Sequence, residues 1–401
     1  FQAEDGIRDV AVTGVQTCAL PICIFTEAIG GRVPTIYDPA TTVLLPTGGA
    51  GRAPFDDNTI PSDRIDPVAG ALLARYPVPT SAGAANNYRR TANETVDQDQ
   101  FSARVDQHVG TRNQLFARLT RFHETFLPVT PLPEGSGVTS GTLGPQATTA
   151  WSFASSYQRT FSDRMLNELR VGDTRRAVAR SAATLGMSAG AALRIPGIPG
   201  TARFPDTLPT FLIAGYQQLG SPANTATTFA TGVTEVANTF TWVTGRHTIK
   251  AGADVRWARL DVVQPPSPTG SFTFSSLFTD LPGTSNTGTP LASFLLGHVQ
   301  QFSIDLQQDE IQNRAHIQEY FAQDDWRVSS RVTINAGLRY TLNFPSTEQH
   351  NQSAVFNLAT QQLEYLGRDG HPRSARRLHA NNVGPRLGIV GRVTEIGRAH
   401  V

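Results

Sequence analysis

The sequence has 401 residues and a formal net charge of +1 at pH 7, which leaves room for two or three soluble domains or for one large barrel. Its near-neutral charge indicates neither nucleic acid nor an anionic surface as a partner. No run approaches the roughly eighteen apolar residues of a membrane-spanning helix. A helical membrane protein is thereby excluded, but a barrel is not, because lumen-facing residues dilute the hydropathy of its strands.

Both ends of the sequence look foreign to it. QAEDGIRDVAVTGVQTCALPI (Gln2–Ile22) resembles a translated sequencing-library adapter, and EIGRAHV (Glu395–Val401) resembles the opposite adapter. We therefore expect residues 1–23 and 395–401 to be adapter-derived. The remaining residues are free of cysteine, so neither a disulfide framework nor a thiol site is predicted.

Residues 24–98 are rich in Gly, Pro, Asn and Asp and show no sustained period, which is typical of an ordered loop region. One short helix is predicted within it. Asp66 is placed to cap the helix, Pro67 suits its first turn, Leu72 belongs to its apolar face, and Pro77 follows its end.

From residue 99 onwards, runs of alternating apolar and polar residues predict four hairpins and a ninth strand. The predicted strands are Gln100–Val109 with Gln114–Phe122, Thr149–Thr160 with Met165–Asp173, Val233–Val243 with Thr248–Leu260, Asn313–Arg327 with Val332–Asn343, and Val383–Arg392. The alternation in Val332–Asn343 is unbroken over the whole run. Such a run is longer than the usual globular strand of about five or six residues, and about nine to eleven tilted residues cross a bilayer.

The connections between these strands alternate in length. Those within a hairpin are short, whereas those between hairpins are long and rich in Pro, Gly, Ser and Thr: His123–Thr148, Thr174–Gly232, Asp261–Gln312 and Phe344–Asn382. A soluble β-sandwich does not require short and long connections to alternate. An outer-membrane barrel does show this alternation, because it has short periplasmic turns and long extracellular loops. We therefore expect an all-β fold over residues 99–394: a partial, open antiparallel transmembrane β-barrel of about nine strands, with residues 24–98 as an extracellular loop region.

The aromatic residues fit this interpretation. Trp242 lies just before a tight turn and Trp257 about ten residues beyond it, which places them near opposite rims of an apolar band. The alternative, that such residues form the core of a soluble sheet, stays open at this point.

Eleven charged residues lie on the polar sides of the predicted strands: Arg104, Asp106, Arg118, Glu168, Arg170, Glu235, Lys250, Asp254, Arg256, Arg339 and Arg386. On a lipid face each Arg or Lys would cost about 2–4 kcal/mol near the midplane. We therefore expect them to face a hydrated lumen of mixed charge, which could hold a plug or guide a solute. For any single residue, ordinary solvated strand polarity is the alternative.

No catalytic, cofactor-binding or metal-binding constellation is found in the sequence. The histidines form no close pair and no HExxH motif. Asp324 and Asp325 are neighbours on a strand, so they face opposite sides and cannot share a proton. GxSxG, P-loop and dinucleotide motifs are also lacking. We therefore expect no enzyme, cofactor or metal.

Several runs resemble the Oar-like TonB-dependent receptors of soil bacteria. They are IYDPATT (Ile36–Thr42), NTIPSDRIDPVAGALLARYPVP (Asn58–Pro79), DQFSARVDQHV (Asp99–Val109), EYFAQDDWRVSSRVTINAGLRY (Glu319–Tyr340) and VGPRLG (Val383–Gly388). The resemblance implies an outer-membrane barrel of about twenty-odd strands, a plug domain, and an N-terminal motif that couples to the TonB complex. The plug and the motif would lie upstream of this sequence, and no ligand residue can be carried over.

The sequence thus predicts an internal fragment of a TonB-dependent receptor in a Gram-negative outer membrane, active in ligand-gated, energised uptake of an unknown solute. Its expected partners are outer-membrane lipid, the missing plug of the same chain, the TonB complex and the solute. The alternative is an adhesion or surface-display barrel that binds through its loops without transport, and an outer-membrane enzyme is a weaker third possibility. A plug and coupling motif upstream would favour transport.

Overall fold

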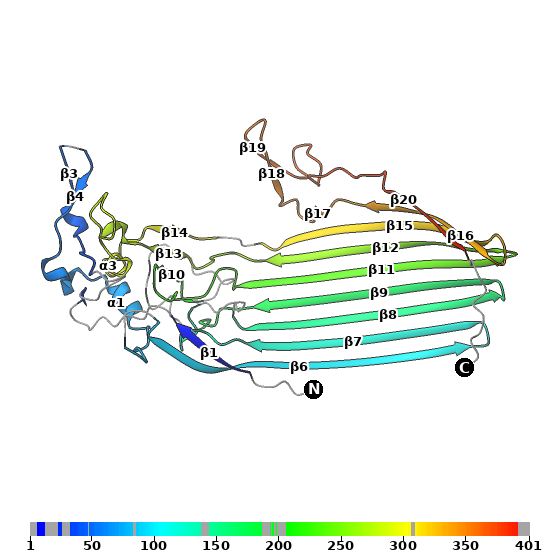
Figure 1. Cartoon of the computed structure of the whole chain (residues 1–401), viewed down its shortest axis with the longest axis horizontal. Coiled ribbons are helices and arrows are strands. Elements are labelled where there is room, and N and C mark those ends of the chain that lie inside the picture. Colours follow the sequence, from blue (N-terminus) through cyan, green and yellow to red (C-terminus); the bar gives the residue numbers. More distant parts are fainter. Residues whose placement is uncertain are drawn as a thin grey trace.

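An antiparallel sheet of long strands dominates the structure (Figure 1). The structure is a computed structural model that describes residues 6–12, 23–25, 33–46, 48–82, 86–137, 144–186, 193, 195, 198, 206–305 and 309–391. The main sheet has 11 strands in the order β1-β6-β7-β8-β9-β11-β12-β15-β16-β20, with β17 also paired to β15. From β6 to β20, strands that are neighbours in the sheet follow each other in chain order, as in a meander.

The strands of this sheet are β1 (Gly6–Val12), β6 (Tyr88–Val109), β7 (Asn113–Leu127), β8 (Gln146–Ser162), β9 (Met165–Arg180), β11 (Thr227–Thr244), β12 (His247–Val263), β15 (Ile311–Arg327), β16 (Val332–Asn343), β17 (Thr347–Glu348) and β20 (Val383–Gly391). All nine predicted strands are present, and each is antiparallel to its neighbours. The tight turns lie together at one end of the sheet and the long connections leave from the other (Figure 1).

Most strands extend further towards the long connections than the alternation predicts. The clearest difference is β6, which has 22 residues and begins at Tyr88, inside the segment 24–98 that was expected to be loop. Its first part pairs with β1 and the next part with β7. Backbone pairing holds this largely polar stretch in the sheet, and Tyr88 at its start is buried in the core of the loop cap. That residues 1–23 derive from an adapter stays a prediction.

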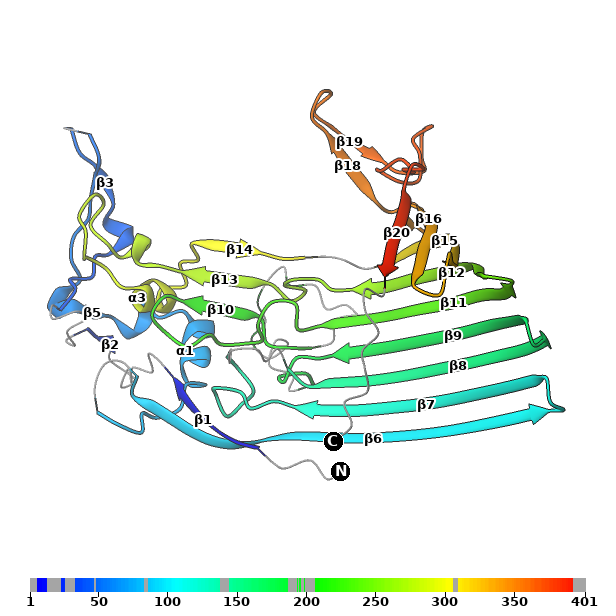
Figure 2. The same ribbon diagram turned by 45° about the vertical axis from the view of Figure 1, so that its right-hand side comes forward.

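The sheet is curved and open. Figure 2 shows β15, β16 and β20 turning away from the plane of the earlier strands. The pairing order begins at β1 and finishes at β20, which do not pair with each other. The fold is therefore an open portion of a barrel wall, in agreement with the predicted fold class.

Described residues of the segment 23–87 and of three long connections, those between β7 and β8, β9 and β11, and β12 and β15, pack together at the far end of the strands into one folded unit, here called the loop cap. The connection between β16 and β20 contributes no residue to the core of this unit. It contains the helices α1 (Pro67–Leu73) and α3 (Pro290–Leu295), the single-turn helices η1 (Pro39–Thr41), η2 (Asp56–Asn58), η3 (Ser62–Arg64) and η4 (Ser276–Phe278), the sheet of β10 (Thr210–Ile213), β13 (Ser271–Phe274) and β14 (Gln301–Ser303), and the short pairs β2 (Cys23–Ile24) with β5 (Thr59–Ile60) and β3 (Val43–Leu44) with β4 (Ala50–Gly51). Within the described residues no helix is long and apolar enough to cross a bilayer.

The hydrophobic core of the described residues lies in this cap rather than in the sheet. Ile36, Leu132, Leu219 and Phe294 are at most 1% exposed and pack into one cluster, although they come from four separate connections. The T-shaped contact of Phe274 with Phe294, at 5.1 Å between ring centroids, joins β13 to α3. Burying such side chains is worth about 1.5–3 kcal/mol each, so the connections stabilise one another as a unit.

The predicted helix is confirmed as α1. The Asp66 side chain accepts hydrogen bonds from the backbone N–H groups of Val68 and Ala69 at 2.8 and 3.0 Å, and Pro67 occupies the first turn. Capping of this kind is worth about 1 kcal/mol. Leu72 is fully buried in the core of the loop cap, so the helix holds part of residues 24–87 against the other connections.

Ion pairs tie the same connections together. Arg52 contacts Asp280 at 3.0 Å and Arg75 contacts Glu134 at 2.8 Å, so each pair joins two different connections. Within the segment that precedes β6, Arg64 donates to both carboxylate oxygens of Asp38 at 3.0 Å. These hydrogen bonds hold the pKa of the Asp38 carboxyl below its usual range.

Candidate functional site

The eleven charged residues predicted to share a side of the sheet do share one. In an antiparallel sheet, residues directly opposite each other lie on the same face, and successive residues alternate. The register places Arg104 opposite Arg118, Glu235 opposite Arg256, and Arg386 opposite Gly337. The cross-strand pairs between the other strands link these positions to one another, so all eleven residues lie on the same face. We call this side the polar face and the other side the apolar face.

An ion-pair network centred on Arg256 lies on the polar face of β12, β15 and β16. Arg256 donates to Asp254 on its own strand at 3.0 Å and to Glu319 of β15 at 2.8 Å. Glu319 also accepts a hydrogen bond from the Thr341 hydroxyl at 3.3 Å and lies 4.0 Å from Arg339. Asp254 and Glu319 are only 18% and 15% exposed, so the shared guanidinium offsets the cost of desolvating two carboxylates.

Glu319 was not among the eleven predicted residues. It shares its side of β15 with Ile317 and Phe321, which makes the alternation of that strand ambiguous. The useful signal was its cross-strand position, because it lies directly opposite Asp254 and Thr341. That register cannot be read from one strand alone.

A second charged group lies on the polar face of β6 and β7. Arg104 makes two hydrogen bonds of 2.7 Å to Asp106, and its guanidinium lies over the Phe116 ring at 4.8 Å from the centroid. Arg118 is the direct cross-strand partner of Arg104. The strands β8, β9 and β11 separate this group from the Arg256 network. Between them Glu168 accepts a hydrogen bond from Ser156 at 3.1 Å.

The remaining predicted residues lie around the Arg256 network. Lys250 is on β12, directly opposite Gln323, and Arg170 is on β9, directly opposite Ala237. Arg339 and Arg386 border a recess of about 560 Å³ near the edge of the sheet. The polar face thus presents guanidinium, ammonium and carboxylate groups on one side of the sheet, which suits contact with water, a polar polypeptide or a hydrated solute.

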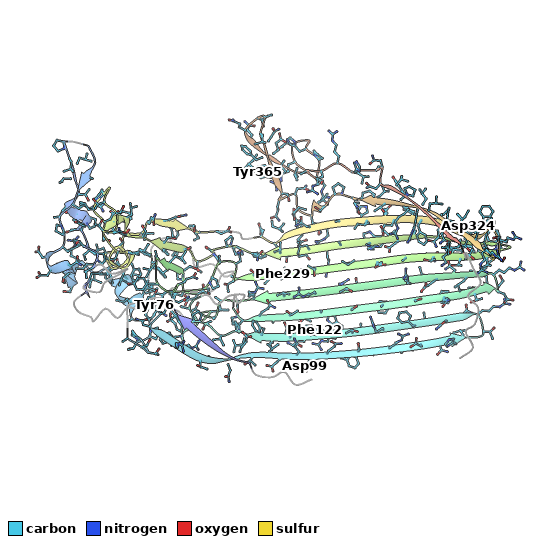
Figure 3. All side chains as sticks on the ribbon, viewed as in Figure 1. Tyr76, Asp99, Phe122, Phe229, Asp324 and Tyr365 are labelled. Carbon is cyan, nitrogen blue, oxygen red and sulfur yellow. The ribbon has the colours of Figure 1, made fainter. Side chains whose placement is uncertain are left out.

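The apolar face carries aromatic groups at its two ends. Near the tight turns, the His247 ring stacks on Trp326 at 5.5 Å and its Nδ1 contacts a carboxylate oxygen of Asp324 at 2.5 Å. Figure 3 shows Asp324 at this end and Tyr76 in the loop cap at the opposite end. The register places Asp324 and Asp325 on opposite faces, so they do not form a dyad. Trp257 lies on the apolar face near the long connections.

Among the described residues, no group of three or more His, Cys, Asp or Glu side chains is placed to hold a metal ion.

Long antiparallel strands, tight turns at one end, large connections at the other, and one apolar and one polar face together define the wall of an outer-membrane β-barrel. The chain belongs to the family described as outer membrane beta barrel domain, which matches residues 12–399. It is therefore an outer-membrane protein of the Gram-negative type, in contact with membrane lipid.

Three solved structures show what the chain is similar to. The ferric-catecholate import receptor Fiu from E. coli K12 has 9% identity and a TM-score of 0.35, over 75% of this chain and 42% of its own. The ferric preacinetobactin receptor BauA from Acinetobacter baumannii has 10% identity and a TM-score of 0.37, over 75% and 38%. The copper transporter OprC has 9% identity and a TM-score of 0.35, over 73% and 33%. The matched part is thus less than half of each of these chains. No curated protein matches the sequence.

Proposed function

We propose that this chain forms part of the barrel of a TonB-dependent receptor, in which the polar face lines the lumen and a solute is taken up by ligand-gated, energised transport. The observation that carries the proposal is the single register that puts all eleven charged residues, and Glu319, on one face of the sheet. At about 2–4 kcal/mol for each Arg or Lys in lipid, that face is the one turned away from the membrane.

The parts of the receptor have different tasks in this proposal. The loop cap faces the outside and captures the solute. The charged polar face holds the plug domain of the same chain, which the family resemblance places upstream, and offers ion pairs that a polar solute or a moving plug can exchange. The TonB complex, acting on an N-terminal motif, supplies the energy. The chain itself has no catalytic task in this mechanism.

A second candidate function is adhesion or surface display. The observation in its favour is the hairpin of β18 (Ala354–Asn357) and β19 (Gln362–Tyr365), which projects from the sheet (Figure 2). Phe356 and Leu363 are direct cross-strand partners on it and are 57% and 60% exposed. An exposed apolar patch at the tip of a surface loop is a feature that binding proteins use.

The experiment that separates the two functions uses the protein at its full genomic length, expressed in cells with and without a working TonB complex. Mass spectrometry of the culture medium records which small molecules the cells remove. Transport predicts that at least one compound is removed only when TonB works. Binding of a compound or surface to the cells that is equal in both strains, with no TonB-dependent removal, would support adhesion instead.

A further inference from the structure

The recess at β15, β16 and β20 lies on the polar face, between the Arg256 network and the tight turns. Its volume is about 560 Å³, which is within the range of small-molecule sites. The side chains that line it from the polar face are Phe321, Gln323, Arg339 and Arg386. Phe321 and Gln323 follow Glu319 along β15 towards the tight turn, so a solute that moves through the lumen to the periplasm meets the recess after the network.

Glycines keep the recess open. Gly337 and Gly384 line it, and the register places both on the polar face. Gly252 of β12 is the cross-strand partner of Phe321, and a Cβ at Gly252 would lie 2.6 Å from the Phe321 ring. The ring therefore lies over the backbone of Gly252 as one wall of the recess, while no side chain grows from Gly337 or Gly384 to fill it.

Two guanidinium groups share this space. Arg386 is the direct cross-strand partner of Gly337, so Arg339 is its diagonal neighbour, at a separation of about 7–8 Å that long side chains bridge. The Arg339 side chain is 61% exposed and lies 4.0 Å from Glu319. Arg386 is exposed as well, and no hydrogen bond or ion pair of the described residues involves its guanidinium group.

The carboxylates on either side do not neutralise these two arginines. Glu319 accepts its short hydrogen bond, at 2.8 Å, from Arg256. Asp325 lies nearer the tight turn, and within the described residues it forms no ion pair with an arginine of the recess. Lys250 of β12 lies beside the recess, directly opposite Gln323, and the ion pairs of the described residues include none to its ammonium group. The recess therefore has an excess of positive charge.

An organic anion matches both the charge and the shape of the recess. Like charges on neighbouring strands destabilise a sheet, and a cavity lined by one sign of charge concentrates ions of the other sign. A carboxylate or phosphate accepts paired hydrogen bonds from the planar guanidinium of arginine. The Phe321 ring offers an apolar surface beside these groups, whereas a cation would be repelled by them.

We propose that this recess is a binding site for an anionic solute on its way through the lumen. The acidic group of the solute lies between Arg339 and Arg386, and its apolar part packs against Phe321. The inference rests on the proposed function, in which the polar face lines the lumen. It adds the chemical class of the solute, which is an organic anion with an apolar part.

The test measures binding to the full-length protein in a non-ionic detergent by isothermal titration calorimetry. The probe is phthalate, an aromatic dicarboxylate, and the uncharged dimethyl phthalate is its control. We expect phthalate to bind and the ester not to bind. The double variant Arg339→Gln/Arg386→Gln should weaken phthalate binding about ten-fold or more. The matched control Arg376→Gln/Arg377→Gln removes two exposed arginines from the connection between β16 and β20 and should leave phthalate binding unchanged.

A second variant changes the space and leaves the charge as it is. The backbone of Gly384 is outside the left-handed region, and a Cβ there would lie 3.8 Å from its nearest neighbour, the backbone oxygen of Arg339. Gly384→Leu therefore fits locally, keeps both arginines and places a side chain in the recess. We expect it to weaken phthalate binding about ten-fold or more, and it tests the site even if the double variant fails to fold.

Three results would overturn the inference: equal binding of the ester, unchanged binding in either variant, or no binding of phthalate to the folded protein, which is the result expected if a carboxylate of the plug fills the recess. The uptake experiment tests the inference separately, because every compound removed only when TonB works should carry an acidic group. TonB-dependent removal of neutral compounds alone would reject this inference and leave transport standing. Phthalate binding without TonB-dependent removal of any compound would reject transport and leave the site standing.

Discussion

Arg256 of β12 and Glu319 of β15 form a 2.8 Å hydrogen-bonded ion pair that joins the polar faces of two neighbouring strands. Because Asp254 shares the same guanidinium, the three groups depend on one another. A residue that the alternation left out of the polar pattern is therefore part of its largest network.

The network predicts that removing Arg256 destabilises the protein more than removing Glu319 does. Glu319→Gln leaves Arg256 paired with Asp254, so we expect a loss of at most about 1 kcal/mol in the free energy of unfolding. Arg256→Met leaves the half-buried carboxylates of Asp254 and Glu319 without their shared donor, so we expect the free energy of unfolding to fall by about 1–3 kcal/mol. Urea unfolding of the full-length barrel in detergent measures both. Equal losses in the two variants would contradict the network.

The two faces of the sheet predict opposite tolerance to charge. Ala251→Arg and Leu338→Arg place a guanidinium on the apolar face and are expected to reduce assembly, since each costs about 2–4 kcal/mol near the midplane. The matched changes Thr248→Arg and Thr333→Arg lie on the polar face of the same strands and are expected to be tolerated. The amount of heat-modifiable, folded protein in outer membranes is the readout. Similar yields for all four variants would mean that the apolar face does not meet lipid.

The core of the loop cap predicts a local loss of structure. Phe294→Ala removes a side chain that is 1% exposed, and such truncations cost about 3–5 kcal/mol. We expect the connections to become sensitive to protease while the strands stay assembled. Leu358→Ala is the control, because that side chain is 84% exposed. Loss of barrel assembly in Phe294→Ala would show that the cap and the sheet fold as one unit.

The Asp38–Arg64 pair predicts a pH dependence of the loop cap. Hydrogen bonds from Arg64 lower the pKa of folded Asp38, whereas the unfolded carboxyl has a pKa of about 3.9. The unfolded state therefore binds the proton more readily, and the pair contributes stability above the unfolded pKa that is lost as the pH falls through the folded pKa. The rate of hydrogen exchange in α1, followed as the pH is lowered, measures this loss of stability. In Asp38→Asn, we expect the share of the pH dependence that the pair contributes to disappear. An unchanged profile in that variant would assign the acid sensitivity to other groups.

The sequence predicts the sheet well because its signals are local. The strand from Val332 to Asn343 shows its two faces within its own residues, and each tight turn is adjacent to the strands it joins. The sequence does not predict the start of β6 at Tyr88, because most of that end of the strand is polar. Its place depends on backbone pairing and on the burial of Tyr88 in the core of the loop cap, whose other residues are distant in sequence.

The loop cap and the site were harder to predict because their contacts are distant in sequence. Ile36, Leu132 and Phe294 belong to connections without period, and only folding shows that they share a core. The eleven charged positions could be assigned to one side of their strands, but the partners of Arg256 could not.

The central claim is that this sheet is a barrel wall with its tight turns in the periplasm and its loop cap outside. Single cysteines at Ser162 and Ser329, at the tight-turn end of the sheet, and at Ser285 and Leu358, in the connections, test it in a cysteine-free, full-length protein. All four positions are exposed. With a membrane-impermeant maleimide on intact cells, we predict labelling at Ser285 and Leu358, and labelling at Ser162 and Ser329 only after the outer membrane is opened. Labelling of either turn in intact cells, or protection of either connection, would contradict the orientation and the barrel.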